Sequence, residues 1–159
     1  MDEASYLTTI ETILRIALGL RFLYSGISNV RRWPNPVRNA EIVFSFGATV
    51  FGLIAVFLMI AGGLGLILGF ETRVAALMIV LFLLPTFKIQ HHWLYTLPPM
   101  IEGMNRALGQ EERNKFRVLA KHAIHSHETG WQNNFLMLIV ALFFAVRGSP
   151  AFGFDNLLR

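Results

Sequence analysis

The chain has 159 residues, of which 54% are hydrophobic and only 15% are charged, and it contains no cysteine. Soluble domains usually carry about 25% charged residues, so this composition is typical of a protein surrounded by lipid. The lack of cysteine excludes disulfides and thiolate metal sites, and a formal charge of only +4 does not favour nucleic acid as a partner. We therefore expect one all-α integral membrane domain over residues 1–159.

The first predicted span covers residues 10–30 and contains two arginines. Arg15 lies near the outer boundary with Glu11 four residues before it, so an ion pair or snorkelling explains it. Arg21 lies deep in the span, where an arginine costs about 3 kcal/mol or more unless protein, water or a ligand meets it. Its candidate partners are a backbone carbonyl, another subunit, a bound anionic or carbonyl-bearing ligand, or one of three side chains: Tyr24, Ser25 and Asp155.

The second predicted span, residues 48–70, contains no charged residue and carries small residues at four-residue intervals. Small residues on one helix face let another backbone approach closely. We therefore predict that Gly62, Gly65 and Gly69 pack against another helix, either within this chain or in a second subunit.

Two further spans complete a predicted four-helix bundle. The third covers residues 74–91 and contains Pro85, which should kink it. The fourth covers residues 133–147 and is short for a span. Between them, residues 111–127 have apolar side chains at three- and four-residue spacing with charges opposite, which predicts a separate amphipathic helix. This helix would lie on the cytoplasmic membrane surface or cap the bundle.

Basic residues gather in the two longer connections, 31–47 and 94–130. The positive-inside rule therefore places both connections in the cytoplasm and both termini outside. The acidic N-terminus differs from the basic start of a signal peptide, so we expect the first span to be retained. These features predict a multi-pass protein of a bacterial-type cytoplasmic (inner) membrane, with lipid, other membrane subunits or a second copy as partners.

The five histidines form two groups that should meet at one membrane face: His91 and His92 end the third span, and three others precede the fourth. Imidazole suits proton transfer or metal binding near neutral pH. One interpretation is a proton-relay or quinone-headgroup site at this face, beside Trp93, and another is an interfacial position with no special role. A third is a metal site formed by the later histidines, His122, His125 and His127.

Four segments carry a recognisable pattern: LRIALGLRFLYSGISNV, GGLGLILGFETRVAAL, HHWLY, and the closing stretch that begins IHSHETGWQNNF. In this order they resemble the DoxX-like family of small four-span membrane proteins. Arg21 is not among the positions that match and is this chain's own addition. The matching positions are Arg15, Gly19, Phe22, Gly26, Gly62, Gly63, Gly69, Thr72, Arg73, His125, Asn134 and Asp155.

The chain departs from the family's pattern at three positions. The family often has a lysine where Asn29 stands and a glutamate near Met59, and a lysine commonly precedes the final-span asparagine, where this chain has Asn133. The resemblance therefore implies the fold, but it implies no ion-pair or proton-handling role at these positions.

The resemblance also implies a function, because some members look like the membrane subunit of a quinone-linked sulfur oxidoreductase. We accordingly predict a membrane subunit or partner of a redox complex, with a quinone or another lipid-like molecule as its ligand. Two alternatives stay open: a non-enzymatic assembly subunit that docks through the small-residue face, and a metal-handling membrane protein. No known hydrolase, nucleotide-binding or metalloprotease motif is present. The residues predicted to meet a ligand or partner are Arg15, Arg21, Tyr24, His91, His92, Trp93, His125, Asn134 and Asp155.

Overall fold

The computed structural model describes residues 3–149 and 153–157, which form six helices and no strand. Three of these helices, α3, α4 and α5, are long and apolar enough to cross a membrane. α1 is also long, with 29 residues, but its charged residues, which include Arg15 and Arg21, make it less apolar than the other three. The helix bounds are α1 Glu3–Arg31, α2 Asn35–Val43, α3 Ala48–Leu68, α4 Thr72–Ala107, α5 Gln110–Arg147 and α6 Phe154–Leu157.

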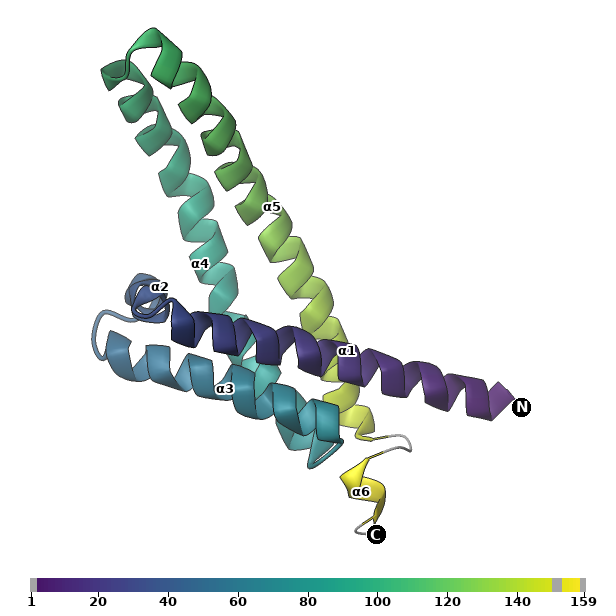
Figure 1. Cartoon of the computed structure of the whole chain (residues 1–159). Helices are drawn as coiled ribbons and strands as arrows, with labels where there is room; N and C mark the ends of the chain where they lie inside the picture. The colour runs from purple at the N-terminus through teal and green to yellow at the C-terminus, as the bar shows by residue number, and fades with distance from the viewer. Residues whose placement is uncertain (1–2, 150–152, 158–159) are drawn as a thin grey trace.

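The sequence predicted a four-helix bundle, and the long helices are arranged as two crossed pairs. α1 and α3 lie side by side and run antiparallel, while α4 and α5 form a long hairpin that crosses this pair obliquely (Figure 1). α3 packs on both α1 and α4, whereas α1 and α5 barely meet. The core lies at this crossing and includes Leu18, Phe22, Met59, Leu66, Ile79, Leu83 and Phe144.

Glycines on two faces of α3 explain how it can pack on both neighbours. A Cβ atom added at Gly63 would lie 2.7 Å from the backbone nitrogen of Leu23 in α1. On the other face, a Cβ atom at Gly65 would lie 2.7 Å from the Cβ of Ala75 in α4, and one at Gly62 would lie 2.8 Å from Ile79. The small-residue surface is therefore occupied by helices of the same chain.

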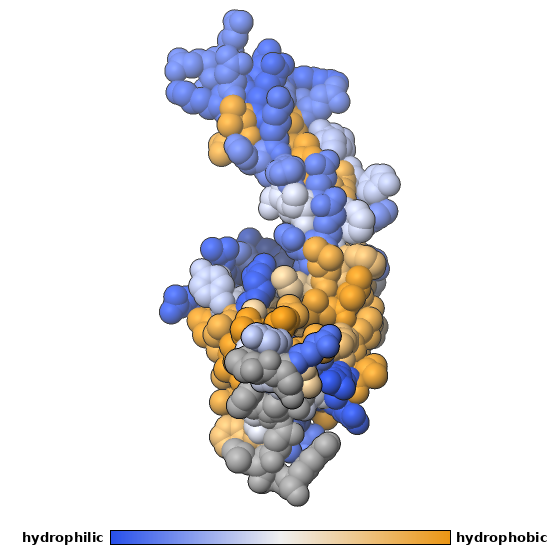
Figure 2. All heavy atoms as spheres, turned by 90° about the vertical axis from the view of Figure 1, so that its right-hand side faces the viewer, coloured by the Kyte–Doolittle hydropathy of each residue, from blue (hydrophilic) through white to orange (hydrophobic). Residues whose placement is uncertain are grey.

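The segment between the third and fourth spans differs from the prediction. Residues 94–130 are not a loop with a separate amphipathic helix: they continue α4 and α5, and the helix is broken only at 108–109. Pro85 lies inside α4, within the third predicted span as expected. We call residues 92–130 the polar extension, since Figure 2 shows the far part of the hairpin as a largely hydrophilic projection beyond an apolar body.

Candidate functional site

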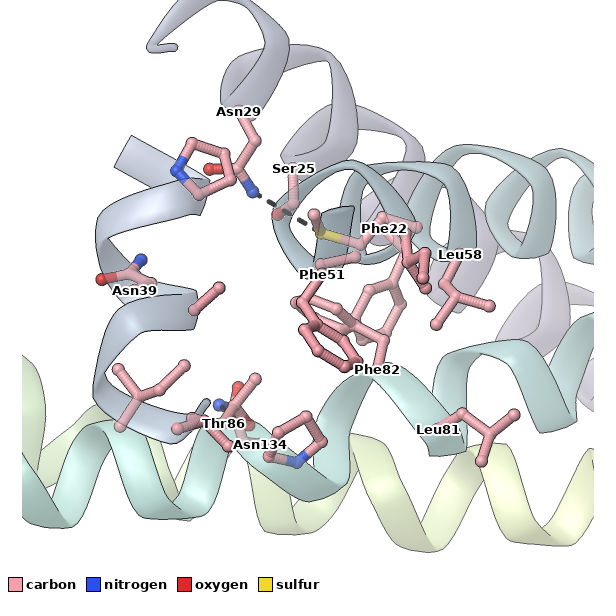
Figure 3. A pocket seen from close by; sticks show the side chains of 18 of the residues that line it. Phe22, Ser25, Asn29, Asn39, Phe51, Leu58, Leu81, Phe82, Thr86 and Asn134 are labelled. Carbon is pink, nitrogen blue, oxygen red and sulfur yellow. Dashed lines mark hydrogen bonds between the residues drawn. The ribbon is translucent and has the colours of Figure 1, made fainter. Parts of the chain in front are cut away.

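A cavity of about 560 Å³ lies between α1, α2, α3, α4 and the second half of α5. Its walls differ in character (Figure 3). Ser25 and Asn29 of α1 lie on one side, and Thr86 and Asn134 lie across from them on α4 and α5. Aromatic side chains occupy the region to one side of these polar groups: Phe22, Phe51 and Phe82.

One face of α1 supplies a polar wall of this cavity. Arg21, Ser25 and Asn29 recur every four residues and therefore project from the same side of the helix. The Arg21 Nη1 group donates a hydrogen bond to Ser25 Oγ at 2.7 Å, and the Arg21 side chain is exposed. Ser25 was among the partners anticipated for this arginine. Of the described residues that line the cavity, Arg21 alone carries a formal charge.

The opposite wall is built from hydrogen-bonded polar groups. Asn134 Nδ2 donates to Thr86 Oγ1 at 3.0 Å, and Thr86 Oγ1 donates to the carbonyl oxygen of Leu83 at 2.5 Å. Gln90 also lines the cavity, and its Oε1 lies 2.7 Å from Nδ1 of His127. An amide oxygen only accepts, so this nitrogen carries the proton. Burial lowers the pKa of His127, which favours a neutral ring at pH 7.

Two departures from the family's pattern are neighbours in this cavity. Asn29 Nδ2 lies 3.6 Å from the sulfur of Met59, and both residues line the cavity wall. The family often has a lysine at the first position and a glutamate near the second. In this chain both of these charged residues are replaced by uncharged ones. No unpaired lysine or glutamate is therefore left in this apolar setting.

A second polar cluster lies at the other end of the α1–α3 pair, where Arg15 is covered by the C-terminal segment. Arg15 is only 1% exposed, and its Nη1 group donates to Ser149 Oγ at 2.6 Å. Its guanidinium lies against Gly69 and Gly153. A Cβ atom at Gly153 would lie 2.7 Å from Nη1, and one at Gly69 would come closer still. Gly69 also has a φ of +63°, a conformation that favours glycine.

Asp155 connects this cluster to the start of α4. Its carboxylate accepts hydrogen bonds from the backbone N–H groups of Glu71 at 2.6 Å and Thr72 at 3.0 Å. Its own N–H donates to the carbonyl oxygen of Gly69 at 2.9 Å. Burial acts to raise the pKa of Asp155, but the hydrogen bonds from Thr72 and Glu71 and the charge of Arg15 outweigh it and hold the pKa below 3.8. A charged carboxylate therefore caps α4. We call Arg15, Gly69, Thr72, Ser149 and Asp155 the Arg15 cluster.

The roles of the two arginines differ from those predicted. Glu11 was expected to pair with Arg15, but its Oε2 atom lies 3.5 Å from Nη2 of Arg147 at the end of α5. Arg15 is buried rather than snorkelling, and Gly69, Ser149 and Gly153 lie against its guanidinium. Arg21, expected to lie deep in the span with a partner inside the bundle, is exposed at the cavity and bonds to Ser25 of its own helix.

The remaining predicted residues divide between these places and the outer surface. Asn134 lines the cavity and Asp155 belongs to the Arg15 cluster, whereas Tyr24 is 73% exposed outside both. The centre of the His91 ring lies 4.4 Å from the centre of the Tyr95 ring. The described residues that line the cavity do not include the four predicted residues of the histidine-rich membrane face: His91, His92, Trp93 and His125.

The predicted metal ligands also lie in the polar extension. His125 Nδ1 is 3.7 Å from a carboxylate oxygen of Glu128, while His127 contacts Gln90 and stacks on Trp93. Over residues 3–149 and 153–157, no three histidine, aspartate or glutamate side chains are grouped so that they could hold a metal ion. The geometry therefore provides no support for a site formed by His122, His125 and His127.

Several cavity residues were not singled out from the sequence. Asn29 and Asn133 were noted only as departures from the family, and Asn39 and Gln90 were not considered as ligand contacts. The four-residue spacing of Arg21, Ser25 and Asn29 within an apolar span was an available signal for a polar helix face. No comparable signal marked Asn39, since its place depends on how α2 packs beside α3.

The long apolar helices α3, α4 and α5 indicate a helical membrane protein, and the cavity lies between its helices. The family model DoxX matches residues 10–93, more than half of the chain, and the chain belongs to the DoxX family. The matched range includes α2, α3, most of α1 and the first part of α4, and therefore both arginines. No curated protein and no solved structure matches the chain.

Proposed function

We propose that this DoxX family protein is a membrane subunit of a redox complex and that its cavity binds a quinone. The cavity with polar groups on two opposite sides is the observation that carries the proposal. A quinone headgroup is a flat ring with carbonyl acceptors on opposite edges. The amides of Asn29 and Asn134 would serve these edges, while aromatic side chains such as Phe51 would pack on the ring.

The size of the cavity is consistent with this ligand. Small-molecule sites usually measure about 300–1,000 Å³ and are mostly apolar, with a few polar groups that fix orientation. The cavity of about 560 Å³ falls within this range. The redox assignment is supported by the resemblance to membrane subunits of a quinone-linked oxidoreductase. The histidines contribute indirectly, since His127 holds Gln90 at the cavity wall.

We further propose that α1 crosses the membrane beside α3, which would make four spans. α1 packs on α3, and close contact at Gly19 and Gly63 seats the two helices together. In this topology α2 and the polar extension lie in the cytoplasm of a bacterial-type cell. α2 is linked to this side of α4 by Lys88, four residues before the polar extension, whose Nζ donates to the carbonyl oxygen of Val43 at 3.3 Å. The redox partner would bind on this side or within the bilayer.

The assembly-subunit alternative has less support than the quinone site. It relied on a small-residue face that was free to dock on a larger membrane protein. Gly62 and Gly65 are already packed against Ala75 and Ile79 of α4. A partner could reach that face only by displacing α4.

Two measurements on the full chain in mild detergent test quinone binding. Lipid extracts of the purified protein should contain a quinone, and added decylubiquinone should bind with a saturable change in heat or melting temperature. Ala55 lines the cavity, so Ala55→Phe should fill it and weaken decylubiquinone binding by roughly tenfold or more. Ala17→Phe on the exposed surface of α1 is the matched control and should bind normally.

The proposal fails if wild-type protein contains no quinone and does not bind decylubiquinone. It also fails if Ala55→Phe, folded as judged by its melting curve, binds decylubiquinone as tightly as Ala17→Phe does.

A further inference from the structure

We propose that Arg21 makes the cavity select a ligand whose headgroup carries a negative charge, such as a deprotonated hydroxyquinone, over an uncharged ring of the same shape. The inference rests on the proposed quinone site and adds the specificity of that site. Arg21 is the specificity-determining residue, and the amides on both walls would hold charged and uncharged rings alike.

The charge of Arg21 is not neutralised inside the cavity. No aspartate or glutamate is found among the described residues that line it. Glu41 on α2 is exposed and does not line the cavity, and Lys88, the nearby cation at the base of the polar extension, donates to Val43. A negatively charged oxygen on the ligand would therefore be the acidic group that meets this guanidinium.

The guanidinium also has donors to offer. It carries five N–H donors in a planar fork, and Nη1 uses one of them on the hydroxyl of Ser25 at 2.7 Å. Ser25 lies in the next turn of the same helix, so this bond orients the side chain without linking α1 to another element. Arg21 is thus held at the cavity wall with most of its donors left for a ligand.

The surroundings strengthen any such contact. Apolar side chains such as Phe22 and Leu58 line the same cavity, and a lower effective dielectric makes the attraction between opposite charges larger than it is in water. A hydrogen bond between charged groups is roughly twice as strong as one between neutral groups. An uncharged quinone would gain only the weaker kind of bond from Arg21.

Two ring-matched probes test the inference on the full chain in nanodiscs of zwitterionic lipid. 2-Hydroxy-1,4-naphthoquinone is an anion at neutral pH, and 1,4-naphthoquinone has the same ring without the charge. The hydroxylated probe should bind roughly tenfold more tightly to wild-type protein. Arg21→Gln should reduce this ratio to about one, since it removes the charge but keeps an amide donor.

Two further variants complete the comparison. Arg21→Lys keeps the charge and should retain part of the preference, even though it loses the planar fork. Arg31→Gln removes a charge from an exposed position in the last turn of α1, outside the cavity, and should leave the ratio at the wild-type value.

The outcomes separate this inference from the quinone proposal. Equal binding of the two naphthoquinones to wild-type protein, or an unchanged ratio in Arg21→Gln, overturns the inference while the quinone site stands. A second matched pair, dodecanoate and dodecanol, covers a lipid acid as the source of the charge. If dodecanoate binds in an Arg21-dependent way and neither naphthoquinone binds, the charge selection is supported and the quinone function is lost.

Discussion

Arg15 and Arg21 lie six residues apart on α1, yet their surroundings are opposite. Arg15 is 1% exposed and is held by Ser149 and the charge of Asp155. Arg21 is exposed at a cavity and bonds to a hydroxyl of its own helix. Six residues turn a helix by about 240°, so the two side chains meet different neighbours. An arginine in a membrane helix is thus explained by what covers its face of the helix, not by its depth in the span.

The largest expected effect is on the free energy of unfolding, which should respond very differently to replacement of Arg15 and of Arg21. Arg15→Met should lower the free energy of unfolding by about 3 kcal/mol or more, because it leaves buried polar partners without their cation. Arg21→Met should change it by less than about 0.5 kcal/mol, since its side chain is exposed. Thermal or denaturant unfolding of both variants in the same detergent measures the difference. Equal losses would contradict the proposed division between a structural and a ligand-facing arginine.

A smaller loss of stability is expected when alanine replaces Gly69, which lies against the Arg15 guanidinium. Gly69 and Gly47 both have positive φ values, +63° and +68°, so alanine should cost about 1–2 kcal/mol at either position. Only at Gly69 would the new Cβ collide with the Arg15 guanidinium, whereas at Gly47 the nearest atom, in the Phe51 ring, lies 3.7 Å away. Gly69→Ala should therefore be the less stable variant by about 1 kcal/mol. Equal melting temperatures would show that Arg15 can move aside.

The smallest of these effects concerns the carboxylate of the Arg15 cluster. Asp155→Asn should lower the free energy of unfolding by about 1 kcal/mol at neutral pH, because it removes the charged cap of α4. The pKa of Asp155 in the folded protein lies below the unfolded value of 3.8. Its stabilisation is thus present above pH 3.8 and is lost as the pH falls through the folded-state pKa.

Acid titration of the melting temperature tests this sign. The wild-type protein should lose its advantage over Asp155→Asn as the pH is lowered from about 5 to about 2. Asp155→Glu keeps the charge and is the matched control. If the difference in melting temperature between wild-type protein and Asp155→Asn stays constant over this range, ionisation of Asp155 does not contribute to the stability of the folded protein.

Much of the fold was predictable, but the ends of its helices were not. The predicted span 48–70 agrees with α3, Ala48–Leu68, because an uninterrupted apolar run has few other solutions in lipid. The amphipathic stretch 111–127 is helical as predicted, yet it is the first half of α5. Residues 94–130 were expected to be a connection, yet Pro98 and Pro99 at its start lie inside α4. Periodicity indicates that a helix exists and says little about where it ends.

The sites divide in a similar way. Arg15, Gly69, Thr72 and Asp155 were all singled out through the family's pattern, but nothing in the chain order showed that they meet. The cavity was harder still, because its lining comes from five helices and includes Asn39 on the short helix α2, which was not predicted. The histidines and Trp93, for which a quinone-headgroup site was one interpretation, do not line the cavity, and all of them except His91 lie in the polar extension.

The sequence by itself determined that the chain is a helical membrane protein of the DoxX family, because composition and local pattern are properties of neighbouring residues. It also marked both arginines as unusual. Only the tertiary structure decided what each one does, since burial depends on residues distant in the chain: Ser149 lies 134 positions beyond the arginine it contacts. That contact leaves Arg15 inside the fold, while the packing of α2, α4 and α5 leaves Arg21 facing a cavity.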